Sequence, residues 1–323
     1  MRRGISILIA LAWFASGPAV SQQPVGVATP GMGSLGHAVG TAIAKEVQEK
    51  SGIPAVVQPY SGTAAFFPLL SQGAVQFGVA AYVEGAFAVM GTGPSEGRPT
   101  PNVRMVANIA PALVGLFVRR DSDIKSVQDM KGKRFPVGWV SFPIAVNFIN
   151  AMLATGGLEM PGDFKPHPVP SILRGADDFV AGKTDVGYFA VGAGKMSEIN
   201  VAVPGGIRFV SLNDSPEALR NLRRHAPGTS IVRVQPAPHF AGVIEPTNVM
   251  AVDLVLFAGA HVDDDTVYRV VKAMHENPQG LAASNPFLKS FAPEKMAKAY
   301  DEVKYHPGAI KAYGERGLWP PKL

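Results

Sequence analysis

The sequence predicts an α/β protein made of two similar units, with the second unit inserted into the first. Short apolar runs of strand character alternate with longer segments in which apolar residues recur every three or four positions. This alternation is typical of parallel strands joined by helices. A long apolar segment at residues 248–260 is expected to be a strand that returns the chain to the first unit. The 323 residues, of which 47% are hydrophobic, suffice for two cores.

The first unit, domain I, is expected over residues 22–112 and 248–323. Three strands are predicted before the insertion, at residues 25–28, 55–58 and 77–81. The helix after the first strand runs to about residue 49, and four of its residues are spaced to share one buried face: Ala38, Ala42, Ile43 and Val47. A second helix opens at residues 61–63. After the return strand, helices are predicted at residues 263–277 and 293–304, and a last one begins at Pro307.

The second unit, domain II, is expected over residues 113–247. It opens with an apolar segment at residues 113–118, and its strands are predicted at residues 134–138, 167–169, 186–189 and 207–212. A short capped helix is expected at residues 126–132, and longer helices end near residue 154 and span residues 171–181. Hinges between the units are expected near residues 110–113 and 245–248.

The N-terminal segment has the layout of a cleaved secretory signal over residues 1–21. Arg2 and Arg3 precede an uncharged apolar run, and small residues follow at 19–21. A buried N-terminal helix is the alternative, but Gly17 and Pro18 break the run where a cleavage region begins. We therefore expect an exported, periplasmic chain that starts near Gln22, and such a location disfavours ATP- and NAD-dependent chemistry.

Charge and cysteine content narrow the function further. The formal charge is +5 and falls to +3 without the two signal arginines, because 28 basic residues then face 25 acidic ones. The excess is mild and forms no basic run, so nucleic-acid binding is not expected. The chain has no cysteine, which excludes disulfides, thiol catalysis, thiolate metal sites and a lipid anchor on an N-terminal cysteine. We expect a soluble product.

Three predicted strand-to-helix turns carry small or hydroxylic residues. They comprise Gly33, Ser34 and His37 in the first turn, Ser61, Gly62 and Thr63 in the second, and Ser141 with Phe142 in the third. Ligands of open α/β sheets bind beyond the carboxyl ends of strands, and helix N-termini favour anions. As an alternative, Ser34, Thr63 and Ser141 are plain N-caps, each contributing about 1 kcal/mol. Three such turns in two units favour an anion-binding cleft.

Four aromatic residues lie near these turns and are candidates for the walls of a small-molecule pocket: Tyr82, Trp139, Phe142 and Tyr188. Trp139 and Phe142 have core packing as an equal alternative. The seven histidines form no closely spaced pair, so no metal site is expected. Residues 31–36 match G-x-G-x-x-G, but Gln58 ends the second strand where a dinucleotide site needs an acid. No cofactor is expected.

Several short motifs follow one another along the chain: GSLG at residues 33–36, AIA at 42–44, YSGT at 60–63, SVQDMKGKR at 126–134, AGKTDVG at 181–187, DDDTVY at 263–268 and HPGA at 306–309. In this order, they resemble the TAXI-type solute receptors of tripartite ATP-independent periplasmic (TRAP) transporters over nearly the whole mature chain. The resemblance implies a two-lobed periplasmic-binding-protein-like (type II) fold with a ligand cleft between the domains. It also implies a small solute, such as glutamate, a dicarboxylate or a similar organic acid, and delivery to a membrane permease.

The chain departs from this family at two turns. His37 and Ala38 replace a tyrosine pair, and residues 139–142 replace a small glycine-rich turn, which predicts a bulkier and more apolar wall. We expect a binding protein and not an enzyme, with Ser34, His37, Ser61, Thr63 and Ser141 donating to a carboxylate. Two alternatives remain: a receptor of an ATP-driven importer for sulfonates or pyrimidine precursors, and a periplasmic enzyme in which Glu84 or Asp185 contacts His37.

Overall fold

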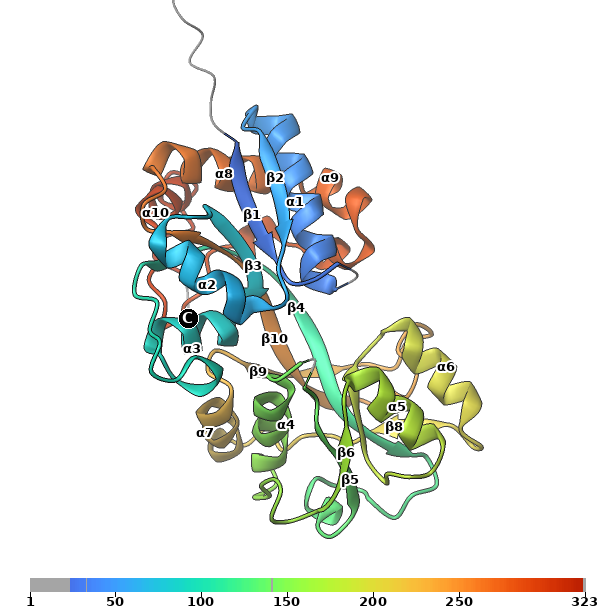
Figure 1. The fold of residues 1–323 in the computed structure, drawn as a ribbon. Helices are drawn as coiled ribbons and strands as arrows, with labels where there is room; N and C mark the ends of the chain where they lie inside the picture. Colours follow the sequence, from blue (N-terminus) through green and yellow to red (C-terminus); the bar gives the residue numbers. More distant parts are fainter. Residues whose placement is uncertain (1–23, 33, 141, 322–323) are drawn as a thin grey trace, which may run out of the picture.

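The computed structural model describes residues 24–32, 34–140 and 142–321. Figure 1 shows two lobes joined by two long strands, β4 (Val103–Arg119) and β10 (Thr247–Gly259). The predicted signal lies outside the described residues. Within the described ranges, eight strands form one sheet in the order β2-β1-β3-β10-β4-β7, with β8 paired to β4 and β9 to β10, and β5 and β6 form a separate parallel pair.

Lobe I contains the first strands and the C-terminal helices. Its elements are β1 (Val25–Thr29), α1 (Leu35–Ser51), β2 (Ala55–Pro59), α2 (Thr63–Gln72), β3 (Phe77–Ala81), α3 (Tyr82–Met90), α8 (Asp264–Glu276), α9 (Pro278–Ser284) and α10 (Pro307–Gly314). β1 pairs in parallel with both β2 and β3. The turns after these strands therefore meet at one edge of the sheet, where the second lobe begins.

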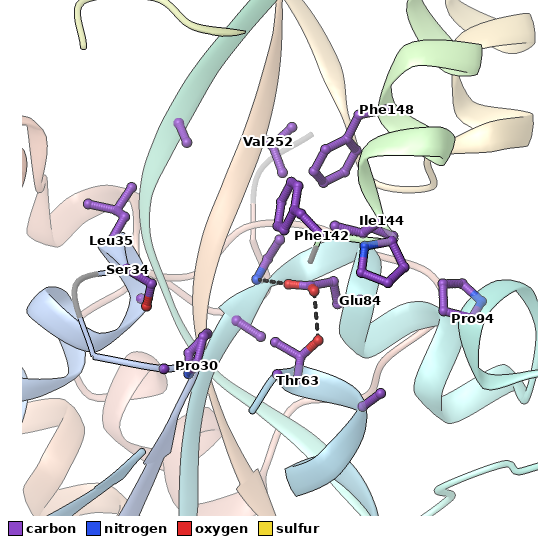
Figure 2. A pocket seen from close by; sticks show the side chains of 18 of the residues that line it. Pro30, Ser34, Leu35, Thr63, Glu84, Pro94, Phe142, Ile144, Phe148 and Val252 are labelled. Atoms are coloured by element: carbon purple, nitrogen blue, oxygen red, sulfur yellow. Dashed lines mark hydrogen bonds between the residues drawn. The ribbon is translucent and has the colours of Figure 1, made fainter. Parts of the chain in front are cut away.

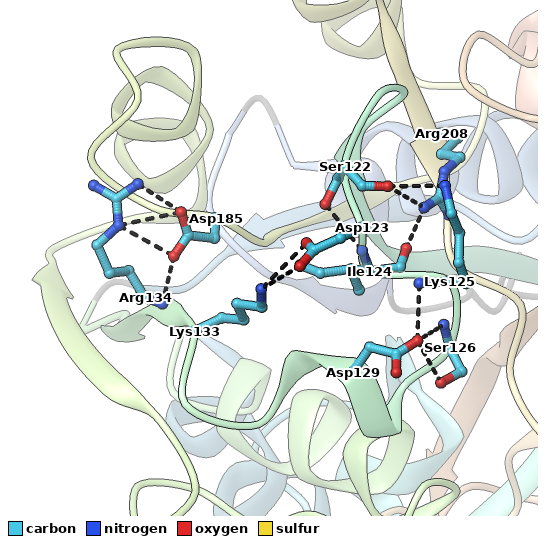
Figure 3. Close-up of polar contacts among 10 residues, drawn as sticks. All are labelled: Ser122, Asp123, Ile124, Lys125, Ser126, Asp129, Lys133, Arg134, Asp185 and Arg208. Atoms are coloured by element: carbon cyan, nitrogen blue, oxygen red, sulfur yellow. Dashed lines mark hydrogen bonds and ion pairs between the residues drawn. The ribbon is translucent and has the colours of Figure 1, made fainter.

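Lobe II is the inserted part of the chain. Its elements are β5 (Arg134–Gly138), α4 (Ala145–Ala154), β6 (Lys165–Val169), α5 (Ile172–Val180), β7 (Gly187–Ala190), α6 (Gly194–Ala202), β8 (Ile207–Phe209), α7 (Pro216–His225) and β9 (Ser230–Val234). Polar contacts of lobe II include the ion pairs of Arg134 with Asp185 and of Lys133 with Asp123, and the buried Arg208 donates to the Ser122 carbonyl (Figure 3). The two ion pairs are partly exposed, so they add little to stability.

The two long strands change partners midway, which joins the lobes into one sheet. Residues 254–258 of β10 pair with β3 of lobe I, whereas residues 247–251 pair with β9 of lobe II. The hydrophobic clusters divide at the same level: Ala110 and Leu254 belong to the cluster of lobe I, and Val114 and Val252 belong to that of lobe II. This division lies a few residues further along β10 than the boundary expected at residue 248, and the domain limits remain a prediction.

Two helices expected from the sequence are wrong. Residues 293–304 contain only a 3-10 turn at Pro293–Lys295, because the backbone after it bonds to the edge of β4 instead: the Asn108 amide donates to the Met296 carbonyl and the Met105 amide to the Lys304 carbonyl, at 2.9 Å each. Residues 126–132 contain only a 3-10 turn at Gln128–Met130. The sequence analysis also missed α3, α6, α7, α9 and β9.

One buried carboxylate gives a prediction for stability at low pH. Asp178 is 5% exposed and accepts a hydrogen bond from His167 at 2.8 Å and another from Lys183 at 3.0 Å. The hydrogen bond from His167 has the largest effect, and Lys183 and Arg174 add to it. Together they lower the pKa of Asp178 to about 2, although burial acts in the opposite direction. Because the pKa is lower in the folded chain, the stabilisation is complete above the ordinary aspartate pKa and is lost as the pH falls toward about 2.

We expect Asp178→Asn to lower the free energy of unfolding at pH 7 by about 1–2 kcal/mol, and this deficit should vanish near pH 2. Urea unfolding at several pH values measures it. Asp177→Asn is the control, because Asp177 is exposed and pairs only with Lys195 among the described residues. An Asp178→Asn deficit that stayed constant with pH would contradict the assignment.

Candidate functional site

A cavity of about 850 Å³ lies between the lobes, beside the two long strands. Lobe I contributes the turns before α1 and α2 and one face of α3. Lobe II contributes the segment that leads into α4, together with Ile172 and the end of β7. Residues of β4 and β10 line it where these strands cross from lobe to lobe, including Val114, Val252 and Leu254. Both lobes and the two strands that join them therefore line the cavity, so a movement between the lobes would change its shape.

The wall of this cavity is mainly apolar. Apolar residues from both lobes and from the crossing strands line it: Leu35, Phe67, Phe87, Phe142, Ile144, Phe148, Ile172, Phe189, Val252 and Leu254. Figure 2 shows Leu35, Phe142, Ile144, Phe148 and Val252 of this set. No lysine, arginine or histidine lies among the described residues that line it. A solute held here must therefore place most of its surface against hydrocarbon.

Glu84 has the one charged side chain among the described lining residues. Its carboxylate accepts a hydrogen bond from the Thr63 hydroxyl at 2.6 Å and another from the Ala81 amide at 3.1 Å. Figure 2 shows the Glu84 carboxyl between Thr63 and Phe142. Burial raises the pKa of Glu84, and the bonds from Thr63 and Ala81 oppose this shift only in part.

The first turn of α2 opens into the cavity. Its N-cap is Gly62, so no side chain satisfies the amides of this turn, and Gly62, Thr63 and Ala64 all line the cavity. The first turn of α1 differs, because the Ser34 hydroxyl accepts a hydrogen bond from the His37 amide at 3.1 Å. Of these two helix starts, α2 is the one whose first two amides, those of Thr63 and Ala64, have no hydrogen-bond acceptor among the described residues, whereas the Ala65 amide donates to the Gly62 carbonyl at 3.2 Å.

The structure brings six predicted site residues to the cavity wall: Ser34, Ser61, Gly62, Thr63, Phe142 and Tyr188. Gly33 and Ser141 lie outside the described residues. Ser34 acts as the N-cap of α1, which was the alternative to ligand binding. The Thr63 hydroxyl donates to Glu84, so the expectation that this proton bonds to a solute carboxylate does not fit the structure.

Three other predicted site residues lie away from the cavity wall. His37 has its Nδ1 atom 3.0 Å from the Thr29 hydroxyl. Tyr82 is 1% exposed, and its hydroxyl donates to Glu302 at 2.7 Å while its ring stacks on Tyr300. Trp139 is 1% exposed within the hydrophobic cluster of lobe II. The structure thus places the rings of Tyr82 and Trp139 in the core, and core packing was the alternative given for Trp139.

Sequence reasoning missed most of the apolar wall, including Leu35, Phe87, Ile144 and Phe148. Each is within a few residues of a predicted turn or helix start, which was the available signal. The same reasoning named Glu84 only as a partner of His37. In the described chain Glu84 bonds to Thr63 and Ala81, and Asp185 bonds to Arg134, so neither carboxyl is joined to His37.

Searches for other kinds of site gave two results. Over residues 24–32, 34–140 and 142–321, no group of three or more histidine and acidic side chains is arranged to hold a metal ion. Within the same ranges, no helix combines the length and the apolar character needed to span a bilayer.

Two α/β lobes joined by crossing strands around a cavity define the fold of periplasmic solute-binding proteins. Similar solved structures include a TctC solute-binding protein from Polaromonas, with 13% identity, a TM-score of 0.55 and coverage of 92% of this chain and 94% of that one. They also include the periplasmic aliphatic sulphonate-binding protein SsuA from Escherichia coli, with 14% identity, a TM-score of 0.52 and coverage of 94% and 96%. Residues 27–317 match the NMT1-like family, and the chain belongs to that family.

Proposed function

We propose that this chain is a periplasmic receptor that captures a small organic acid between its lobes and delivers it, chemically unchanged, to a membrane permease. The observation that carries this proposal is the cavity of about 850 Å³, into which the uncapped first turn of α2 opens. A solute carboxylate there accepts hydrogen bonds from the amides of α2 and lies at the positive end of its dipole. The fold, the family and the predicted secretory signal support the same function.

The permease is of the TRAP type in this proposal, as the resemblance to TAXI-type receptors implies. The second candidate is a receptor of an ATP-driven sulfonate importer, because SsuA shares the fold and a sulfonate suits the same amides. A thermal-shift screen that includes both carboxylates and sulfonates separates these solute classes. A ligand at 100 times its Kd should add about 2.7 kcal/mol to the free energy of unfolding.

A substitution at Gly62 tests where the acid binds. Gly62 has open space around its Cβ position and extended backbone, and aspartate is a favoured N-cap. We expect Gly62→Asp to keep or slightly raise stability but to raise the Kd of the solute at least about tenfold, or 1.4 kcal/mol, because the new carboxylate occupies the amides. Calorimetric titration and urea unfolding measure the two effects.

Gly194→Asp is the matched control for this experiment. Gly194 is the first residue of α6, lies in open space and does not line the cavity. Its substitution places the same charge near another helix start and should leave binding unchanged. Equal affinity in wild type and Gly62→Asp would place the acid elsewhere and refute this part of the proposal.

A further inference from the structure

Glu84 is the N3 residue of α3, where its carboxylate caps the Ala81 amide, and it also lines a cavity proposed to receive an acid. It lines a mainly apolar wall, and among the described lining residues no basic side chain faces it. An uncompensated carboxylate in such a place is costly unless a cation or hydrogen-bond donors reach it. The two protein donors, Thr63 and the Ala81 amide, bond to different oxygens, Oε1 and Oε2. Each oxygen therefore keeps a lone pair for a further donor.

The position of Glu84 relative to α2 restricts what that donor is attached to. Thr63, which donates to Glu84, is also the first residue of α2, and the proposed function places the solute carboxylate at the first amides of that helix. The acceptor on Glu84 and the donors of α2 are thus linked by one residue. A solute with an ammonium and a carboxylate on the same carbon presents opposite charges at this short separation.

The remainder of the cavity describes the rest of the solute. Phe142, Ile144, Phe148 and Val252 face the space beside Glu84 (Figure 2). A second carboxylate would lie against these side chains without a protein cation, which disfavours dicarboxylates and acidic amino acids. An aliphatic or aromatic side chain instead gains about 25 cal/mol for each Å² of apolar surface removed from water.

We propose that the solute is an α-amino acid with an apolar side chain, and that Glu84 binds its ammonium group. This inference rests on the proposed function, since it narrows the class of organic acid that the receptor takes. Burial, which disfavours the charged form of Glu84 in the empty cavity, is offset when the ammonium enters.

The test compares leucine and phenylalanine with their deaminated analogues, 4-methylpentanoate and 3-phenylpropanoate, and with glutamate, by calorimetric titration. Wild type should bind the two apolar amino acids at least about tenfold more tightly than the analogues, which lack the ammonium donor, and than glutamate, whose second carboxylate meets the apolar wall. Glu84→Gln should remove the preference for the amino acids over their deaminated analogues, and it should leave binding of the analogues unaffected. Glu49→Gln, an exposed carboxyl on α1, is the control and should change nothing.

Two outcomes overturn the inference. One is that a deaminated analogue binds wild type tightly and that Glu84→Gln weakens its binding as much as that of the amino acids, because Glu84 would then contact the acid group. The other is that an acid of a different class binds wild type in place of the amino acids, and that Gly62→Asp raises its Kd. The receptor function would then stand, but the ammonium site would be wrong. If no organic acid or amino acid binds at all, the proposed function fails as well.

Discussion

Replacing Trp139 with alanine should lower the free energy of unfolding by about 4 kcal/mol, as truncation of a fully buried large aromatic side chain does. Trp139 is 1% exposed and packs in the hydrophobic cluster of lobe II. Its backbone is fixed on both sides, because its amide donates to the Val169 carbonyl at 2.9 Å and its carbonyl accepts from the Phe142 amide at 2.7 Å. The surrounding structure therefore cannot collapse fully onto the space that the ring leaves.

Guanidinium unfolding followed by circular dichroism measures this loss. Val140→Ala is the control, since Val140 is the next residue, is 77% exposed and lines the cavity, so its truncation should cost little stability. The opposite pattern, in which Trp139→Ala keeps its stability but loses solute binding, would restore Trp139 to the site and overturn its placement in the core.

Trp139 also shows where reasoning from sequence stops. The turn after β5 was predicted to lie at the ligand cleft, and Phe142 of that turn lines the cavity. The direction of a ring depends on backbone angles that no spacing reveals: Trp139 has a φ of +41°, which is rare for a residue other than glycine. The indole consequently packs into lobe II, although it lies three residues from Phe142.

The prediction that Tyr82 lines the pocket does not hold, for a related reason. Its position at the end of β3 was predicted, but the segment that covers it was not. Residues 300–303 form an irregular stretch that supplies the stacked Tyr300 ring and the Glu302 carboxylate. A helix was predicted there, because the hydrogen bonds that hold its flanks, Met296 and Lys304, to β4 join residues nearly 200 positions apart and leave no local pattern in the sequence.

The crossing strands were predicted in part. The segment at residues 248–260 was identified as a long strand, and β10 spans Thr247–Gly259. For the other crossing strand, only the segment at residues 113–118 was identified, as an apolar run after Pro111, whereas β4 spans Val103–Arg119. Proline lacks the amide that a ladder requires, and Pro111 lies opposite Asp253, close to a register shift in β10. Pro111 is also exposed, and the pairing of β4 with β7 covers residues 114–117, so the proline lies outside the part of β4 that strands flank on both sides.

Asp253 itself is a buried charge beside the site. Its side chain is 4% exposed, and its carboxylate forms an ion pair with Lys298 and accepts a hydrogen bond from the Tyr300 hydroxyl at 2.7 Å. Its neighbours in β10, Val252 and Leu254, line the cavity. The ion pair between Lys298 and Asp253 links the irregular stretch after residue 295 to β10, which crosses between the lobes.

We expect Lys298→Met to lower the free energy of unfolding by about 3 kcal/mol, because it removes the cation and leaves a buried carboxylate uncompensated. Urea unfolding at pH 7 measures this loss. Lys295→Met, at an exposed residue of the same segment, should have little effect. The double variant Lys298→Met with Asp253→Asn should recover at least half of the loss, because the carboxylate that lacked a partner is then neutral while the amide oxygen still accepts from Tyr300. If the double variant were no more stable than Lys298→Met alone, the loss would come from the packing of the lysine stem against Tyr300, and the charge argument would be wrong.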